Sequence, residues 1–292
     1  MRWRRSPGGS SGIEDRRGAG GGFGGRIPGG RIGGGIGGAG IVGVIVALLV
    51  VFLGGGGGRA FDVGDALEPL PAAPDAAGNV VDDGPDQTAE FVAFVVDDVQ
   101  SAWDEIFRAG GQQYQPTRLV LFTGRVDTAC GTASSASGPF YCPADQRVYL
   151  DLGFFRELER RFGAPGDFAQ AYVIAHEFGH HVQNLLGIMD QVAAAQRDDP
   201  ENANELSVRL ELQADCLAGV WAHSAYEDNL LEPGDLEEGL TAAAAVGDDR
   251  IQQDATGRID RESFTHGTSA ERQEWFQRGF DEGTIQACDT FA

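Results

Sequence analysis

The chain has 292 residues, with 22 basic and 44 acidic side chains and a formal net charge of −22 at pH 7. This length allows one sizeable domain or two small ones, and so negative a chain would repel a phosphate backbone, which argues against nucleic-acid binding. The charge is uneven, because residues 1–31 carry seven Arg against Glu14 and Asp15, whereas the remainder is strongly acidic.

The N-terminal part predicts a membrane anchor. Residues 1–31, rich in Arg and Gly, are expected to form a cytoplasmic leader. Residues 32–53 contain no charged side chain and are long enough to cross a bilayer as one transmembrane helix. The basic residues before this segment favour an N-terminus inside and everything after it outside, so we expect a single-pass protein of the cytoplasmic membrane. A cleaved signal peptide is the alternative.

Residues 54–85 combine glycines with Pro, Ala and Asp, which predicts a flexible linker before an extracytoplasmic domain over residues 86–292. Apolar residues at helical spacing, and short runs rich in β-forming residues, predict the elements of this domain. Helices are expected over residues 87–109, 168–186, 205–226, 233–247 and 270–282, and strands over residues 118–123 and 146–152. Capping is expected from Asp167, Glu238 and either Thr268 or Ser269. The predicted fold class is therefore α+β, mainly helical with a small sheet.

Four cysteines, Cys130, Cys142, Cys216 and Cys288, lie in the part of the chain expected outside the membrane, where disulfides form. They allow three pairings. Cys130 and Cys142 share one loop rich in Gly, Ser and Pro, so they are the first candidate pair, which leaves Cys216 with Cys288. A structural zinc site is the alternative, although no Cys-x-x-Cys spacing supports it.

The segment His176-Glu177-Phe178-Gly179-His180 carries the main chemical signal. On a helix, His176 and His180 lie on one face, so both imidazoles can bind one metal ion. Glu177 follows the first ligand and is placed to act as general base on a water activated by zinc. Gly179 is expected to leave room between the two histidines. The alternative is an ordinary buried helix without metal.

A catalytic zinc site needs a third protein ligand and an open fourth position. Glu211 and Asp215 are also four residues apart on a predicted helix, among apolar neighbours. Glu211 is the candidate third ligand, and Asp215 is the candidate acceptor for the free N–H of His176. A solvated acidic helix face is the alternative.

For His266 and for the strand Val148–Asp151, the sequence supports two roles equally. His266 precedes the last predicted helix, where it is a tentative catalytic residue that stabilises an oxyanion or, equally, a residue that organises the helix start. The strand Val148–Asp151 is a candidate edge on which a peptide substrate pairs or, equally, an internal strand of the sheet. Arg272 is expected to pair with an acid near the site.

At these residues the chain resembles the neutral zinc metallopeptidase family of bacterial membrane-anchored proteins. The matching stretches are Asp127–Pro143, Val148–Leu152, Gly166–Gln183, Ser207–Trp221, Gly247–Asp249 and Phe264–Phe276. More distantly it resembles the CAAX-processing zinc proteases, which implies Glu211 as third ligand and Asp215 behind it. The segment from His266 to Arg272 also resembles that group but has Gly267 where the group has proline. The resemblance implies a zincin-like peptidase domain.

These expectations combine into one mechanism. His176, His180 and Glu211 hold one Zn²⁺ ion, and Glu177 acts as the base that hydrolyses a bound peptide or protein substrate. Two other classes stay open: a zinc-binding, chaperone-like assembly factor without turnover, and a membrane-tethered interaction domain without metal. The sequence carries no signal for the identity of the substrate or for an oligomeric state.

Overall fold

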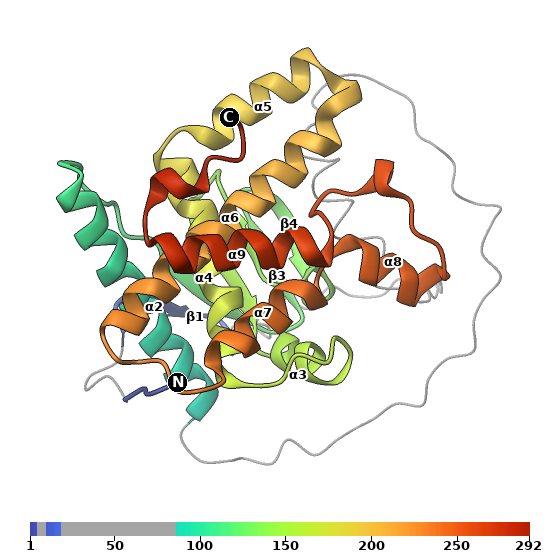
Figure 1. Cartoon of the computed structure of the whole chain (residues 1–292). Coiled ribbons are helices and arrows are strands. Elements are labelled where there is room, and N and C mark those ends of the chain that lie inside the picture. Colours follow the sequence, from blue (N-terminus) through green and yellow to red (C-terminus); the bar gives the residue numbers. More distant parts are fainter. Residues whose placement is uncertain (5–9, 19–85) are drawn as a thin grey trace, which may run out of the picture.

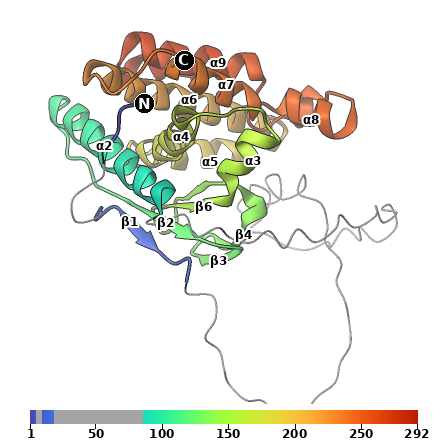
Figure 2. The same ribbon diagram turned by 90° about the horizontal axis from the view of Figure 1, so that it is seen from below.

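The computed structural model describes residues 1–4, 10–18 and 86–292. A small sheet lies along one side of a thicker helical layer, as Figures 1 and 2 show. The helices are α2 (Gln87–Ala109), α3 (Gly153–Arg160), α4 (Asp167–Leu185), α5 (Ile188–Asp198), α6 (Ala203–Glu227), α7 (Asp235–Ala245), α8 (Asp248–Thr256) and α9 (Ser269–Glu282). The expected α+β class, mainly helical with a small sheet, is confirmed.

The four-stranded sheet has the order β1 (Ile13–Asp15), β2 (Arg118–Phe122), β6 (Arg147–Asp151) and β5 (Phe140–Cys142). β6 runs parallel to β2 and antiparallel to β5. It is therefore an internal strand, paired on both sides over residues 147–149. Of the two alternatives for Val148–Asp151, the internal strand is the one observed, and the open edge for substrate is not. A separate hairpin joins β3 (Arg125–Thr128) to β4 (Gly131–Ser134).

Helix α4 is the centre of the domain. It is buried on all sides, and it packs against α2, α6 and α7 as well as against the sheet. Gly179 lies where α4 meets α6, and a Cβ atom there would come within 2.9 Å of the Ala214 carbonyl oxygen. The glycine therefore brings the two helix backbones close together, rather than making room between the histidines as the sequence suggested.

The start of α4 is stabilised by another helix and not by its own side chain. Its N-cap is Gly166, and the backbone N–H of Phe168 donates to the carboxylate of Glu238 on α7 at 3.0 Å. The expected cap Asp167 instead lies 2.6 Å from the α-amino group of Met1. Of the two caps expected at α9, Thr268 is the one observed, since it accepts from the backbone N–H of Glu271. The capping box expected from Glu238 at α7 does not form, because the N-cap there is Gly234 and Glu238 bonds the start of α4 instead.

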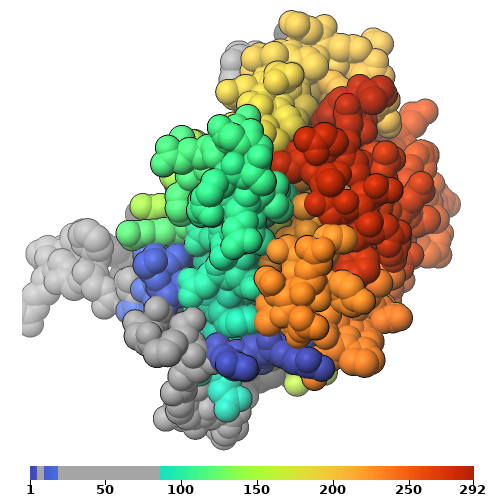
Figure 3. Space-filling view, turned by 60° about the vertical axis from the view of Figure 1, so that its left-hand side comes forward, coloured from blue at the N-terminus to red at the C-terminus, as the bar shows by residue number. Residues whose placement is uncertain are grey.

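The N-terminal residues belong to the folded domain. β1 pairs in parallel with β2, and the N–H of Arg2 donates to the Leu230 carbonyl oxygen at 2.7 Å. Figure 3 shows residues 1–4, in dark blue, lying across α2 and the segment before α7. The described parts of residues 1–31 therefore pack against the domain, and β1 covers the edge of β2 that faces away from β6.

Among the described residues, no helix is both long and apolar enough to cross a bilayer. The predicted anchor at residues 32–53 and the predicted linker at residues 54–85 lie outside the described part of the chain.

Both cysteine pairs expected from the sequence form disulfides. Cys130 and Cys142 join the β3–β4 hairpin to β5, with a Cα–Cα distance of 5.9 Å. Cys216 and Cys288 join α6 to a short 3-10 helix near the C-terminus, with a Cα–Cα distance of 5.4 Å. No cysteine thiol is thus left to hold a structural zinc ion.

Candidate metal centre

The two histidines of α4 and one glutamate of α6 converge on a single point. His176 Nε2 lies 3.1 Å from Glu211 Oε2, and His180 Nε2 lies 3.5 Å from Glu211 Oε1. One donor atom from each of the three side chains lies within 4.8 Å of the other two. The sequence spacing predicted one face for the histidines, and the packing of α4 on α6 adds the carboxylate.

The ring of His176 is held from behind by Asp215. The His176 Nδ1–H group points to Asp215 Oδ1 at 2.8 Å, which leaves the Nε2 lone pair for a metal. Arg272 donates to both oxygens of Asp215, from Nε at 2.7 Å and from Nη2 at 2.9 Å. The hydroxyl of Tyr172 also donates to Asp215. The acid that the sequence placed behind His176 is therefore fully engaged, and the expected pairing of Arg272 with an acid near the site is confirmed.

The electrostatics of the centre favour a cation. Burial lowers the pKa of His176, but Asp215 and Glu211 together outweigh burial and raise that pKa to about 10. Burial likewise raises the pKa of Glu211, but His180, His266 and His176 together hold it well below its usual range. Without metal the centre therefore keeps a proton on His176 and a carboxylate on Glu211. A metal ion would displace that proton, as metal binding to histidine requires.

Glu177 is buried beside the two histidines. Burial raises the pKa of its carboxyl group against the opposing effect of His176 and His180. A carboxylate with a raised pKa is a stronger proton acceptor than an exposed one, which suits a general base.

His266 lies in the loop before α9, where the sequence left open a role in the site or at the helix start. Its ring interacts electrostatically with Glu211, and its Nδ1 lies 3.2 Å from Asp248 Oδ1. Burial lowers the pKa of His266, but Glu211 and Asp248 together raise it by more. The pKa of His266 therefore lies above its usual value. The same Asp248 accepts the backbone N–H groups of Thr265, His266 and Gly267, at 2.7, 2.6 and 3.2 Å. Asp248 therefore fixes the loop that presents His266.

His181 is part of the core. Its Nε2–H donates to the Gln115 carbonyl oxygen at 2.7 Å, and its Nδ1 lies 3.1 Å from the Tyr141 hydroxyl. It does not belong to the metal-ligand group.

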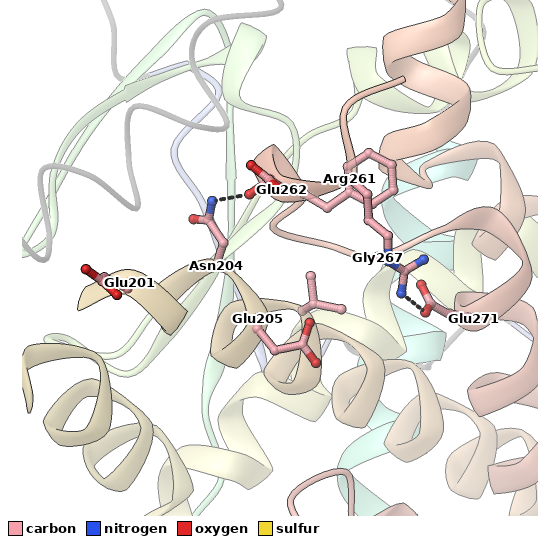
Figure 4. A pocket seen from close by; sticks show the side chains of 9 residues that line it. Glu201, Asn204, Glu205, Arg261, Glu262, Gly267 and Glu271 are labelled. Carbon is pink, nitrogen blue, oxygen red and sulfur yellow. Dashed lines mark hydrogen bonds and ion pairs between the residues drawn. The ribbon is translucent and has the colours of Figure 1, made fainter. Parts of the chain in front are cut away.

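A cavity of about 340 Å³ lies along α6, and none of the proposed metal ligands lines it. It opens beside α6, where Val208 precedes Glu211 by one turn, and beside Gly267, which follows His266. Figure 4 shows Glu205 from α6 on one side and the paired Arg261 and Glu271 on the other. The lining residues are Glu201, Asn204, Glu205, Val208, Arg261, Glu262, Phe264, Gly267 and Glu271.

The donor set fits zinc. Two imidazole nitrogens and one carboxylate match the ligands of catalytic zinc sites, which keep one position open for water or substrate. The Nδ1 atoms of both histidines are already engaged, His176 by Asp215 and His180 by Gln183. The fit thus rests on the two Nε2 atoms, which lie 3.1 and 3.5 Å from the carboxylate oxygens of Glu211.

No role was predicted for Gln183, Tyr172 or Asp248, although all three lie in stretches that carry the family resemblance. Gln183 and Tyr172 sit on α4 at three and four residues from a histidine, so helical spacing alone was a usable signal for both. Asp248 had no such signal, because its contacts with residues 265–267 depend on the loop closing back on α8.

Comparison with known proteins agrees with this geometry. A family model described as "Putative neutral zinc metallopeptidase" matches residues 1–291. The chain is 45% identical over 294 residues to "Uncharacterized protein YpfJ" of Escherichia coli K12, which covers 100% of this chain and 99% of that protein. It is 48% identical over 190 residues to "Uncharacterized protein Rv2575" of Mycobacterium tuberculosis H37Rv, across 61% of this chain and 64% of that one. No solved structure shows significant similarity.

Proposed function

Since this chain belongs to the "Putative neutral zinc metallopeptidase" family, we propose that it hydrolyses peptide bonds at the centre formed by His176, His180 and Glu211. The observation that carries this proposal is the convergence of three donor atoms within 4.8 Å, with the buried Glu177 next to them. A purely structural zinc site would close its fourth position with a protein ligand, and no fourth donor belongs to this group among the described residues.

Zinc, when bound, supplies a Lewis acid that polarises the substrate carbonyl and makes water more acidic. The rest of the chemistry belongs to the protein. Glu177 accepts the proton of the attacking water on its carboxylate and delivers it to the leaving amine. His266, whose Nδ1 is engaged by Asp248, donates from Nε2 to the oxyanion. The cavity lined by Val208 and Gly267 receives part of the substrate chain.

The decisive experiment replaces Glu177 with Gln. The side chain keeps its shape but cannot take up a proton, so we expect hydrolysis of an unstructured protein to fall by roughly 10²–10⁴-fold. Metal analysis should still find one zinc ion per chain. Glu159→Gln, on the exposed face of α3, is the matched control and should keep wild-type activity. Undiminished hydrolysis by Glu177→Gln would defeat the assignment.

The zinc content and the hydrolytic activity of the wild-type protein, measured in the same assays, separate a peptidase from a chaperone-like assembly factor. A wild-type protein that binds zinc stoichiometrically, but cleaves no unstructured protein at any zinc concentration, would favour the assembly factor. Absence of zinc from the purified protein would favour an interaction domain without metal.

We also propose that the domain is extracytoplasmic and attached to the membrane through residues 32–53. The two disulfides support an oxidising compartment. However, the pairing of β1 with β2 puts residues 13–15 on the same side of any membrane as the domain, which a single crossing between them would prevent. Reporters fused to each end of the chain in intact cells decide between a single crossing, with the two ends on opposite sides of the membrane, and an arrangement with both ends on the same side. Reporters on opposite sides would support the single crossing and exclude the β1–β2 pairing.

A further inference from the structure

Two glutamine side chains lie directly behind His180, where neither the metal chemistry nor the family resemblance assigns them a role. Gln183 is fully buried and Gln213 is 6% exposed. A buried amide that makes no hydrogen bond costs free energy, so both groups have to find partners. Their partners connect His180 to the C-terminal tail.

The first link orients His180. Its Nδ1–H group donates to Gln183 Oε1 at 2.8 Å. The amide nitrogen of Gln183 donates in turn to the Leu210 carbonyl oxygen at 2.7 Å and to Gln213 Oε1 at 3.0 Å. Because both amide hydrogens of Gln183 are taken by acceptors on α6, its carbonyl oxygen must face His180. This fixes the proton of His180 on Nδ1 and leaves Nε2 free toward Glu211.

The second link anchors the amide of Gln213. Its Nε2–H donates to the carbonyl oxygen of Cys288 at 2.9 Å. Cys288 is bonded to Cys216, which lies one helical turn after Gln213 on α6. The disulfide therefore holds in place the acceptor on which the amide of Gln213 depends.

The two histidines are thus oriented by different chemistry. A carboxylate, Asp215, lies behind His176 and is neutralised by Arg272. A neutral amide lies behind His180, which orients the ring without adding a negative charge next to Glu177 and Glu211. This difference keeps the negative charge low around Glu177, where the proposed base must take up a proton and give it back.

We propose that Gln183 and Gln213 are positioning residues that hold His180 in its metal-binding tautomer and link it to the disulfide-bonded tail. This inference rests on the proposed metal centre, but it concerns metal affinity and not peptide hydrolysis. A protein that binds zinc and cleaves no peptide would defeat the proposed peptidase activity and leave this inference intact.

The test compares Gln183→Met with Gln196→Met in the full-length chain. Gln196 is a matched control, because it is 7% exposed and its amide also donates to a backbone carbonyl, that of Ala203, and to a side chain, that of Ser207. It contacts none of the proposed ligands. Zinc affinity is measured by competition with a chelating dye, and stability by thermal unfolding of the metal-free protein. We expect both variants to unfold at lower temperature, but only Gln183→Met to bind zinc more weakly, by roughly 10–100-fold.

A second variant, Gln183→Glu, separates orientation from packing. Its carboxylate still accepts from His180 Nδ1, but it offers no N–H to the Leu210 carbonyl or to Gln213. We expect this metal-free protein to be less stable than the wild type, while its zinc affinity stays within a few-fold. Wild-type affinity in Gln183→Met, or affinities that simply follow stability across the three variants, would overturn the inference.

Discussion

Replacing Arg272 with Met tests whether the group behind His176 acts as a buried ion pair. Arg272 is 3% exposed and Asp215 is fully buried, and two hydrogen bonds of 2.7 and 2.9 Å join them. The variant removes the guanidinium group from Asp215 and leaves the protonated ring of His176 as the only cation bonded to this buried carboxylate in the metal-free protein. Removing one partner of such a pair typically costs about 3–5 kcal/mol. We therefore expect the free energy of unfolding of the metal-free protein to fall by about this amount in urea denaturation.

The double variant Asp215→Leu/Arg272→Met completes the reasoning. Replacing both partners of a buried pair by apolar groups is often nearly neutral, so the stability should return to within about 1–2 kcal/mol of the wild type. The zinc affinity of the double variant should be lower than that of the wild type, because His176 Nδ1 then has no acceptor. A loss below about 1 kcal/mol in Arg272→Met would refute the ion-pair argument. Recovery of both stability and zinc affinity in the double variant would refute the orienting role of Asp215.

Two further predictions concern stability away from the metal centre. The Cys216–Cys288 bridge spans 72 residues and the Cys130–Cys142 bridge spans 12. Replacing both cysteines of a pair by Ser should lower the free energy of unfolding, measured by denaturation, by about 4 kcal/mol for the longer loop and about 3 kcal/mol for the shorter one. A larger loss at the shorter loop would contradict the chain-entropy argument. Burial raises the pKa of Asp98 to about 6 from its usual 3.8, so the folded state is favoured below pH 4 and that advantage is lost as the pH rises through 6. Asp98→Asn should therefore stabilise the protein at pH 8 by up to about 3 kcal/mol and change little at pH 4, and equal effects at both pH values would exclude this cause.

Local patterns predicted several elements well. The predicted helix over residues 87–109 coincides with α2, because its apolar residues repeat at helical spacing and Asp86 and Gly110 mark its ends. Thr268 starts α9 through a capping box that can be identified from four residues of sequence. The short helices α3, α5 and α8 were missed. They are 8, 11 and 9 residues long, and few of their side chains are buried.

Long-range contacts account for the errors. Asp167 satisfied the local rule for a cap, but the backbone N–H of Phe168 bonds to Glu238, which is 70 residues further along the chain. β1 is too short and too polar to be identified as a strand, and only its pairing with β2 makes it one. The strand Val148–Asp151 was correctly predicted as a strand, yet whether it lay at the edge depended on which other strands paired with it.

The sequence by itself determined which atoms could bind a metal. Helical spacing put His176 and His180 on one face and Glu211 and Asp215 on another, because residues four apart on a helix always lie together. Only the tertiary structure decided that these two faces meet, through the close approach of α4 and α6 at Gly179. It also decided that an amide, that of Gln183, lies behind the ring of His180, whereas the acid behind His176 was predicted from the sequence. Hydrogen-bond partners between helices depend on packing distances of a few ångströms, and no local pattern in the sequence encodes those distances.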